Sequence, residues 1–303
     1  MKQLTACPSC GSRSLRAFAF TVPEERHGDM HVAQTRCRDC DLVFSNPVAE
    51  ADDLARYYNS AYYEEATSEY NPDTPNLEAS VRARVGPEAE WLRRAVLPYV
   101  DGGGTFLEIG PGYGGLLAGA RELGFTVSGV EPSERVARFA HDVMKLDGVR
   151  HAMFNPLDWP EASFDVIYSY MVIEHVSDLH AFTAGLYRLL KPGGITIVGT
   201  ENHHNVWVMV RRVRSWLKGR RLPEFQTANH HTFYFSDRSL RALFARHGLQ
   251  VFKCQVFSPS LAEKLPRYAF RSWYSKLAFY AMHYADAWTG RGGRVLVWCR
   301  KPF

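Results

Sequence analysis

This 303-residue sequence lacks several features that would each indicate a particular class of protein. It has no run of 18 apolar residues, so no membrane-spanning helix is expected. Its charges nearly balance, with 36 Lys and Arg against 32 Asp and Glu, and a net charge of +4 is too small to indicate nucleic-acid binding by itself. No apolar segment follows Met1-Lys2-Gln3, so we expect no signal peptide and a cytoplasmic location.

Cysteine is scarce too, but four of its six residues form two Cys-x-x-Cys pairs. The pairs are Cys7 with Cys10 and Cys37 with Cys40, and 26 residues lie between them. In a cytoplasmic protein, where thiols stay reduced, such pairs are typical of a tetrahedral zinc site. A closed shell of four thiolates leaves no position for water, so this Zn²⁺ is expected to be structural. Disulfides, or a site that has lost its metal, are the alternatives.

The chain around and after these pairs suggests two small regions ahead of a larger domain. Residues 1–46 contain segments that alternate like the strands of a zinc ribbon. Residues 47–104 are expected to form a helical, Tyr-rich linker or lid, with a helix at about 86–99. Tyr63 and its neighbouring tyrosines could cover a ligand, although an aromatic helix face more often belongs to a core.

The most informative stretch is FLEIGPGYGG, residues 106–115, where an apolar strand enters a turn almost without side chains. A helix is expected to begin at about Gly114. Glu131 follows Gly112 by 19 residues, at the end of a second apolar run. Glycines let the backbone approach a ligand closely, and an acid at the tip of the next strand can accept both hydroxyls of a ribose. The stretch therefore predicts a site for a ligand that carries a ribose.

The glycines fit two patterns. Gly110, Gly112 and Gly115 match G-x-G-x-x-G, the dinucleotide fingerprint, which is weak evidence alone. Glu108, two residues before the first glycine, instead extends the pattern to E-x-G-x-G-x-G, with Gly114 as its last glycine. In this form the stretch resembles the first motif of the class I S-adenosylmethionine (SAM) methyltransferases.

Five further segments resemble the later motifs of that family, in the same order along the chain. They are GVEPSERVARFA (129–140), SFDVIYSYMVIEHVSD (163–178), LLKPGGITIVGTEN (189–202), HHTFYFSDRSLRALFARHGLQVF (230–252) and RVLVWCRK (294–301). The resemblance implies an α/β fold with a Rossmann-like, doubly wound sheet of seven strands, the last of them antiparallel. The methyltransferase domain would span residues 105–303, with inserts at 203–228 and 259–290.

The resemblance also implies which residues bind SAM. Those in the family's positions are Glu108, Gly110, Gly112, Gly114, Glu131, Phe154, Asn155 and the lid residue Tyr63. Glu131 would bind the ribose hydroxyls and the glycines would lie along the methionine part. Phe154 and Asn155 stand where the family contacts adenine, often with an acid, and Asn155 departs from that preference.

Two histidines are candidates for the acceptor side. His175 lies in MVIEHVSD, which matches a family loop that faces the transferred methyl group. His231 lies in a segment similar to one in zinc-ribbon sugar C-methyltransferases, where a Glu-His pair acts at the acceptor. Here His230 stands in place of the acid, which favours O-methylation. We expect His231 to be the general base, with His175 as the second candidate, although either could have only a structural role.

The acceptor is expected to be a small molecule, most simply a sugar, another glycan or a natural-product precursor. The basic, Trp-bearing segment 205–221 has three interpretations: a solvated helix face, a contact for an anionic nucleotide-linked or lipid-linked sugar, or a peripheral contact with an anionic membrane. The alternatives to this function are a zinc-ribbon RNA methyltransferase and a SAM-binding protein without turnover. The small net charge argues against a nucleic-acid partner.

Overall fold

The structure is a computed structural model that describes residues 2–20, 33–48, 50, 54, 75–219, 231–259, 261 and 272–303. Its centre is a seven-stranded sheet with the strand order β6-β5-β4-β7-β8-β11-β10. Strands β6 to β8 are parallel, whereas β11 is antiparallel to both of its neighbours. The strands are β4 (Thr105–Ile109), β5 (Thr126–Glu131), β6 (Val149–His151), β7 (Phe164–Tyr170), β8 (Leu190–Glu201), β10 (Gln250–Phe257) and β11 (Arg294–Arg300). This topology confirms the predicted fold class.

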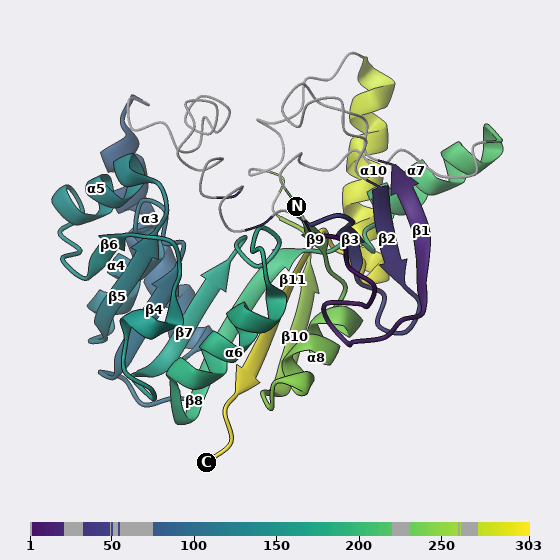
Figure 1. Ribbon diagram of the computed structural model, residues 1–303. Coiled ribbons are helices and arrows are strands. Elements are labelled where there is room, and N and C mark those ends of the chain that lie inside the picture. Colours follow the sequence, from purple (N-terminus) through teal and green to yellow (C-terminus); the bar gives the residue numbers. More distant parts are fainter. Residues whose placement is uncertain are drawn as a thin grey trace.

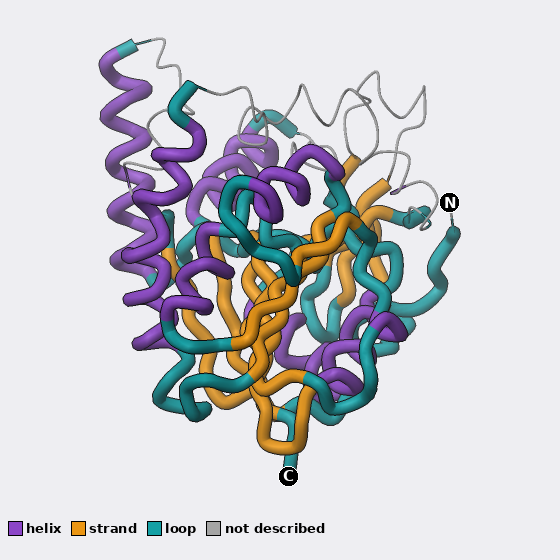
Figure 2. Tube along the Cα trace, turned by 90° about the vertical axis from the view of Figure 1, so that its left-hand side faces the viewer, coloured by secondary structure: helices purple, strands orange, loops and turns teal. Residues whose placement is uncertain are grey.

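Helices cover both faces of this sheet (Figure 2). Side chains alternate between the faces along each strand, so Phe106 joins the core under α3, α4 and α5, and Leu107 joins the core under α6 and α8. The helices are α3 (Leu77–Ala95), α4 (Gly115–Glu122), α5 (Glu134–Asp142), α6 (Leu179–Leu189) and α8 (Asp237–Arg246). Within the described residues, no helix is long and apolar enough to cross a membrane.

Helix α3 differs most from the sequence-based expectation, since it begins at Leu77 rather than near residue 86. The expected range rested on the apolar spacing of the residues after the pair Gly86-Pro87. Val81 and Val85 lie before this pair and are buried on the same face as Leu92. Packing of that face against α4 therefore extends the helix across the Gly-Pro pair.

A second, four-stranded sheet has the order β1-β2-β3-β9. Strands β1 (Leu15–Phe20), β2 (Ala33–Cys37) and β3 (Val43–Ser45) come from the predicted ribbon. Strand β9 (Phe233–Tyr234) comes from the methyltransferase part and pairs with β3. The sheets also share one hydrophobic core, in which Phe44 lies with Leu243 and Phe244 of α8. The N-terminal sheet is thus attached directly to the larger domain, through β9 and α8.

Both predicted inserts contain a helix, α7 (Val206–Leu217) and α10 (Trp273–Thr289). They contact each other and lie beside the N-terminal sheet (Figure 1). The Tyr-rich segment with Tyr63, and His230, fall outside the described residues.

Candidate active site and metal centre

The turn between β4 and α4 has a backbone conformation that lets a ligand lie close to the main chain. Gly110, Gly112 and Gly114 all have positive φ, at 73°, 54° and 82°, a conformation that side chains disfavour. A Cβ at Gly114 would also lie 2.4 Å from Leu146 Cδ1, whereas one at Gly115 would meet nothing closer than 3.9 Å. The three constrained glycines are therefore those of E-x-G-x-G-x-G, and Gly115 of the dinucleotide pattern is an ordinary first residue of a helix.

Glu131 ends strand β5 and its carboxylate turns back to this loop. One oxygen accepts a hydrogen bond from Gly112 N at 3.1 Å and the other from Ser133 N at 3.0 Å. The side chain is buried, and burial raises its pKa to about 7, although the two backbone hydrogen bonds oppose that shift. Each oxygen keeps a further lone pair, so the ionised carboxylate can accept two ribose hydroxyls. This donor and acceptor set fits the ribose of SAM.

Glu108 is buried in β4 on the side of the sheet that faces α3. Burial raises the pKa of its carboxyl well above the usual range, and the negative charges of Glu88 and Glu131 act in the same direction. Arg84 of α3 opposes them. Two acids thus lie close to the glycine turn, and a cationic ligand bound there, such as a sulfonium, would favour their ionised forms.

The two residues expected near adenine each have a local contact. The ring of Phe154 packs edge-to-face on Phe182 of α6, with centroids 5.5 Å apart. Asn155 caps the short helix η2 (Pro156–Asp158), since its side chain accepts from Leu157 N. These contacts explain why the two residues occur here without a ligand, and their role toward adenine stays a prediction.

The two candidate histidines, 56 residues apart in sequence, lie next to each other. Their rings are 4.6 Å apart between centroids and nearly perpendicular. The carboxylate of Glu174 joins them, and one ligand atom from each of the three residues lies within 4.8 Å of the others. Backbone hydrogen bonds hold the cluster together, because Thr232 N and Phe233 N both donate to Glu174 O. The structure therefore brings together the loop after β7 and the segment before β9.

Three titratable side chains, Glu174, Glu201 and Arg294, set the charge around His231. Glu174 is fully buried, and burial raises its pKa to about 8, so its carboxyl is largely protonated at neutral pH. Glu201, at the end of β8, places a carboxylate oxygen 3.5 Å from His231 Nδ1. Arg294 donates to the other oxygen of Glu201 at 2.6 Å. Glu174 stands next to His175 in the loop that the sequence analysis matched to the family, but Glu201 and Arg294 were not selected, although Glu201 ends a buried strand in the motif-bearing segment.

A second cluster was also missed, at the junction of the two sheets. Asp41 follows the second Cys pair and forms ion pairs with Arg36 and His204. His203 Nε2 donates to Asp41 O at 2.9 Å. Burial alone would raise the pKa of Asp41. The hydrogen bond from His204 and the nearby positive charges outweigh burial and lower this pKa to about 2. The cluster is an electrostatic link between the N-terminal sheet and the loop after β8.

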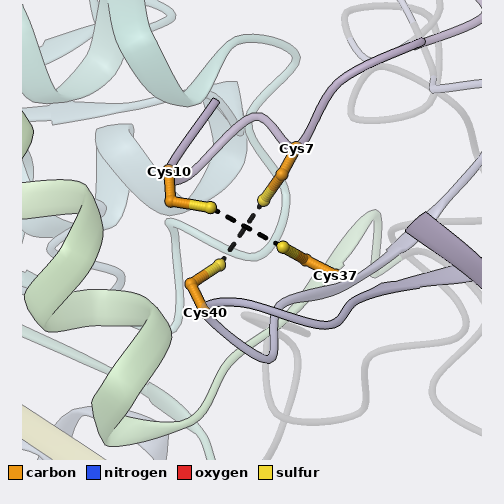
Figure 3. Close-up of side chains that lie close together, drawn as sticks. All are labelled: Cys7, Cys10, Cys37 and Cys40. Carbon is orange, nitrogen blue, oxygen red and sulfur yellow. Dashed lines mark hydrogen bonds between the residues drawn. The ribbon is translucent and has the colours of Figure 1, made fainter. Parts of the chain in front are cut away.

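The four cysteines of the two pairs point toward one centre (Figure 3). The Sγ atoms of Cys7 and Cys40 are 3.5 Å apart, and those of Cys10 and Cys37 are 3.6 Å apart. A disulfide requires about 2.05 Å, whereas a tetrahedron with Zn–S bonds of about 2.3 Å places its sulfurs about 3.8 Å apart. The geometry therefore fits a tetrahedral metal rather than disulfides.

The backbone of the two pairs is similar. Gly11 and Asp41, the residues after each pair, both have positive φ, and each donates its N–H to the first cysteine of its pair. The turn of the first Cys pair, Cys7 to Cys10, also contacts α8, since Ser9 Oγ donates to Ser239 O at 2.8 Å. Two matched turns that aim four thiols at one point are consistent with the predicted zinc site.

Comparison with known proteins adds the family. A family model described as a methyltransferase domain matches residues 82–253, more than half of the chain. The 2-methyl-6-phytyl-1,4-hydroquinone methyltransferase of Synechocystis is 34% identical over 125 residues, 39% of this chain and 37% of that protein. A ubiquinone biosynthesis O-methyltransferase of Rhizobium leguminosarum bv. trifolii is 33% identical over 100 residues, 32% of this chain and 40% of that protein. The matches span less than half the length of these relatives.

Solved structures share the fold. A chain in the complex between the Haloferax volcanii Trm112 methyltransferase activator and a putative methyltransferase has a TM-score of 0.54 and 18% identity, over 84% of this chain and all of that chain. A SAM-dependent methyltransferase from Archaeoglobus fulgidus has a TM-score of 0.51 and 17% identity, over 79% of this chain and all of that chain. Together with the glycine turn and the family match, the sheet order shows that this chain belongs to the methyltransferase-domain family and has the class I methyltransferase fold.

Proposed function

We propose that the protein transfers the methyl group of SAM to a hydroxyl of a small molecule, bound at the carboxyl ends of β7 and β8. The observation that carries this proposal is the cluster of Glu174, His175 and His231, with Glu201 beside it. Ligands of open α/β sheets bind outside the carboxyl ends of the strands, which is where these side chains lie.

The SAM-binding part of the proposal rests on the glycine turn. Gly110, Gly112 and Gly114 allow the methionine part to lie against the backbone, and Glu131 accepts the ribose hydroxyls. When bound, SAM supplies a methyl group that its sulfonium charge already activates, so the protein mainly has to position the acceptor. Phe154, Asn155 and Tyr63 remain the proposed contacts for the rest of the cofactor.

The acceptor hydroxyl must lose its proton as the new bond forms. In the proposed mechanism His231 takes this proton on Nε2, because Glu201 near Nδ1 would hold the other nitrogen as a donor and stabilise the imidazolium. Arg294 keeps Glu201 in place. Protonated Glu174 beside the rings adds no competing negative charge, which leaves Glu201 as the counter-ion.

We further propose that Cys7, Cys10, Cys37 and Cys40 bind one structural Zn²⁺, supported by the tetrahedral arrangement of their sulfurs. For the acceptor, a sugar or related glycan or natural product is the first candidate. A hydroquinone or other phenol is the second, since the relatives named above include hydroquinone and ubiquinone-pathway methyltransferases.

The test is transfer of label from tritiated SAM onto nucleotide sugars, lipid-linked glycans, hydroquinones and RNA. We expect label on a hydroxyl compound with the wild type, and strongly reduced label with His231→Asn at saturating SAM. Glu131→Ala serves as the control that loses SAM binding. Transfer only to RNA, or transfer that His231→Asn leaves intact, would contradict the proposal.

A further inference from the structure

Helix α10 exposes an aromatic face along its whole length. One side of the helix is buried, at Phe279 and at Asp286. The large apolar side chains on the opposite side are 61% to 90% exposed, and their spacing of four and seven residues places them on one face. They are Trp273, Leu277, Tyr284 and Trp288. An amphipathic helix of a globular protein usually turns such a face toward the core.

Helix α7 has the same unusual orientation. Val208 packs against the core of the N-terminal sheet. The most exposed apolar residues lie in the C-terminal half of the helix, where Val213, Trp216 and Leu217 are 54%, 74% and 70% exposed. Residues 203–219 also contain four Arg or Lys and not one Asp or Glu. The helix therefore offers apolar and cationic groups together, without an acid to balance them.

The two helices form one unit, which we term the α7–α10 surface. The carboxylate of Asp286, in the last turn of α10, accepts a hydrogen bond from Val206 N at the start of α7. Ser258 Oγ donates to the other oxygen of the same carboxylate. Because Asp286 is used in these contacts, the one acid of α10 is withdrawn from the exposed face.

This surface is close in sequence to the acceptor site. Only four residues separate Glu201, beside His231, from Val206, where α7 begins. Asn202 in that connection donates to Gly292 O, and Gly292 follows α10 closely. A body that docks on the α7–α10 surface would thus lie next to the edge of the sheet at which the acceptor is proposed to bind.

We propose that the α7–α10 surface docks in the headgroup region of an anionic lipid bilayer. Exposed Trp and Tyr favour the membrane interface, and Arg and Lys beside an apolar face are typical of helices that lie on anionic membranes. RNA binding would depend on cations more than on a face of Val, Leu and Trp. A symmetric contact between two copies would bring the cationic residues of each α7, a helix without Asp or Glu, close together.

The size of the effect can be stated in advance. Each Lys or Arg near an anionic surface strengthens binding about fivefold. Reversal of two charges in Arg214→Glu/Lys218→Glu should therefore lower the partition coefficient at least about tenfold. Trp216→Ser/Leu217→Ser removes two of the most exposed apolar side chains of α7 and should have an effect of similar size.

The experiment is flotation of the full chain with phosphatidylcholine vesicles, with and without about one third phosphatidylglycerol, at low and high salt. We expect binding to the anionic vesicles that salt weakens, and loss of binding in both α7 double variants. Two controls make changes of the same kind elsewhere. Phe303→Ser replaces an exposed apolar residue at the C-terminus, and Arg93→Glu/Arg94→Glu reverses two charges on α3. Both controls should bind like the wild type.

Three results would overturn the proposal: no binding to anionic vesicles at low salt, binding that neither α7 variant changes, or a dimer or RNA complex that the same variants dissociate. The melting temperature of each variant shows whether it is folded. The assay needs neither SAM nor an acceptor, so its failure would leave the proposed methyl transfer standing. Conversely, failure of methyl transfer would leave the membrane contact intact.

Discussion

At the scale of single residues, Glu131 combines two conflicting requirements. It must be ionised to accept two ribose hydroxyls, yet burial raises its pKa to about 7. Its folded-state pKa lies above its ordinary value of 4.5, so in the ligand-free protein its contribution to stability is present below that value and lost as the pH rises through about 7. SAM binding and protonation of Glu131 are therefore expected to oppose each other near neutral pH.

This opposition predicts that the affinity for SAM rises as the pH rises through about 7. Below that pH each unit should cost up to about tenfold, because the neutral acid must first ionise. Glu131→Gln should bind SAM weakly with a flatter pH profile, and Glu131→Ala should lose about ten- to a hundredfold in affinity. Calorimetric titration between acidic and mildly alkaline pH checks this, and equal slopes for wild type and Glu131→Gln would refute it.

The proposed base gives the second residue-scale prediction. His231→Asn should lower turnover by about 10²–10⁴ while SAM affinity stays nearly unchanged, since a positioned base contributes about that much. Glu201→Gln should give a smaller loss, because it removes the counter-ion and not the base. His141→Asn, at an exposed position of α5, is the matched control. A loss below about fivefold in His231→Asn at saturating substrates would exclude it as the base.

At the scale of elements, alanine substitutions at the two glycines where α4 begins should have opposite effects on stability. Gly114→Ala should lower the free energy of unfolding by about 1–3 kcal/mol, because its φ of 82° suits only glycine and Leu146 occupies the position of the Cβ. Gly115→Ala, one residue later, should be neutral or stabilise by up to about 1 kcal/mol, since a helical alanine fits there. Denaturant unfolding of both variants measures this difference. Equal changes in the free energy of unfolding would contradict this interpretation of the turn.

Elements that depend on local patterns could be predicted from the sequence, and those that depend on distant pairing could not. The sequence predicts strands at 105–109 and 164–170, and β4 and β7 have these bounds, because each is a largely apolar run with clear ends. Nothing local indicates that Phe233–Tyr234 pairs with β3, since two residues carry no periodicity. Likewise Asp41 and His203 lie 162 positions apart, and their contact depends on how the two sheets pack together.

At the scale of the whole molecule, the candidate site depends on the same join. His231 was predicted from a resemblance and His175 from another, but their contact depends on how β9 is held. The segment from His231 to Phe235 is bonded on both sides: its backbone donates to Glu174 O, β9 pairs with β3, and Phe235 forms a bridge with Asn202. Any change in the N-terminal sheet should therefore reach the acceptor side before it reaches the SAM side.

Metal removal tests this coupling. The cysteines belong to the hydrophobic core that also contains Phe233 and Leu243, so loss of Zn²⁺ should lower the melting temperature and loosen β9 as well as the turns of the two Cys pairs. Turnover should fall because His231 is no longer fixed against His175, whereas SAM affinity should change less, since β4 and β5 pair with strands of the large sheet and not with the N-terminal sheet. Cys10→Ser should act like a chelator, and Cys254→Ser, outside the cluster, is its control.

The readouts are zinc content, melting temperature, SAM titration and hydrogen exchange of residues 231–235, all on the same preparation. We expect about one zinc per chain before chelation, and after it faster exchange in this segment with an intact SAM site. Exchange should be faster there because a structural metal stabilises the part of the fold that supplies its ligands. In this protein that part extends to the segment with the proposed base, His231. A zinc-free protein with unchanged melting temperature would refute the metal site. Loss of SAM binding in parallel with zinc would instead show that the two sheets unfold as one unit, and that the coupling is not specific to the acceptor side.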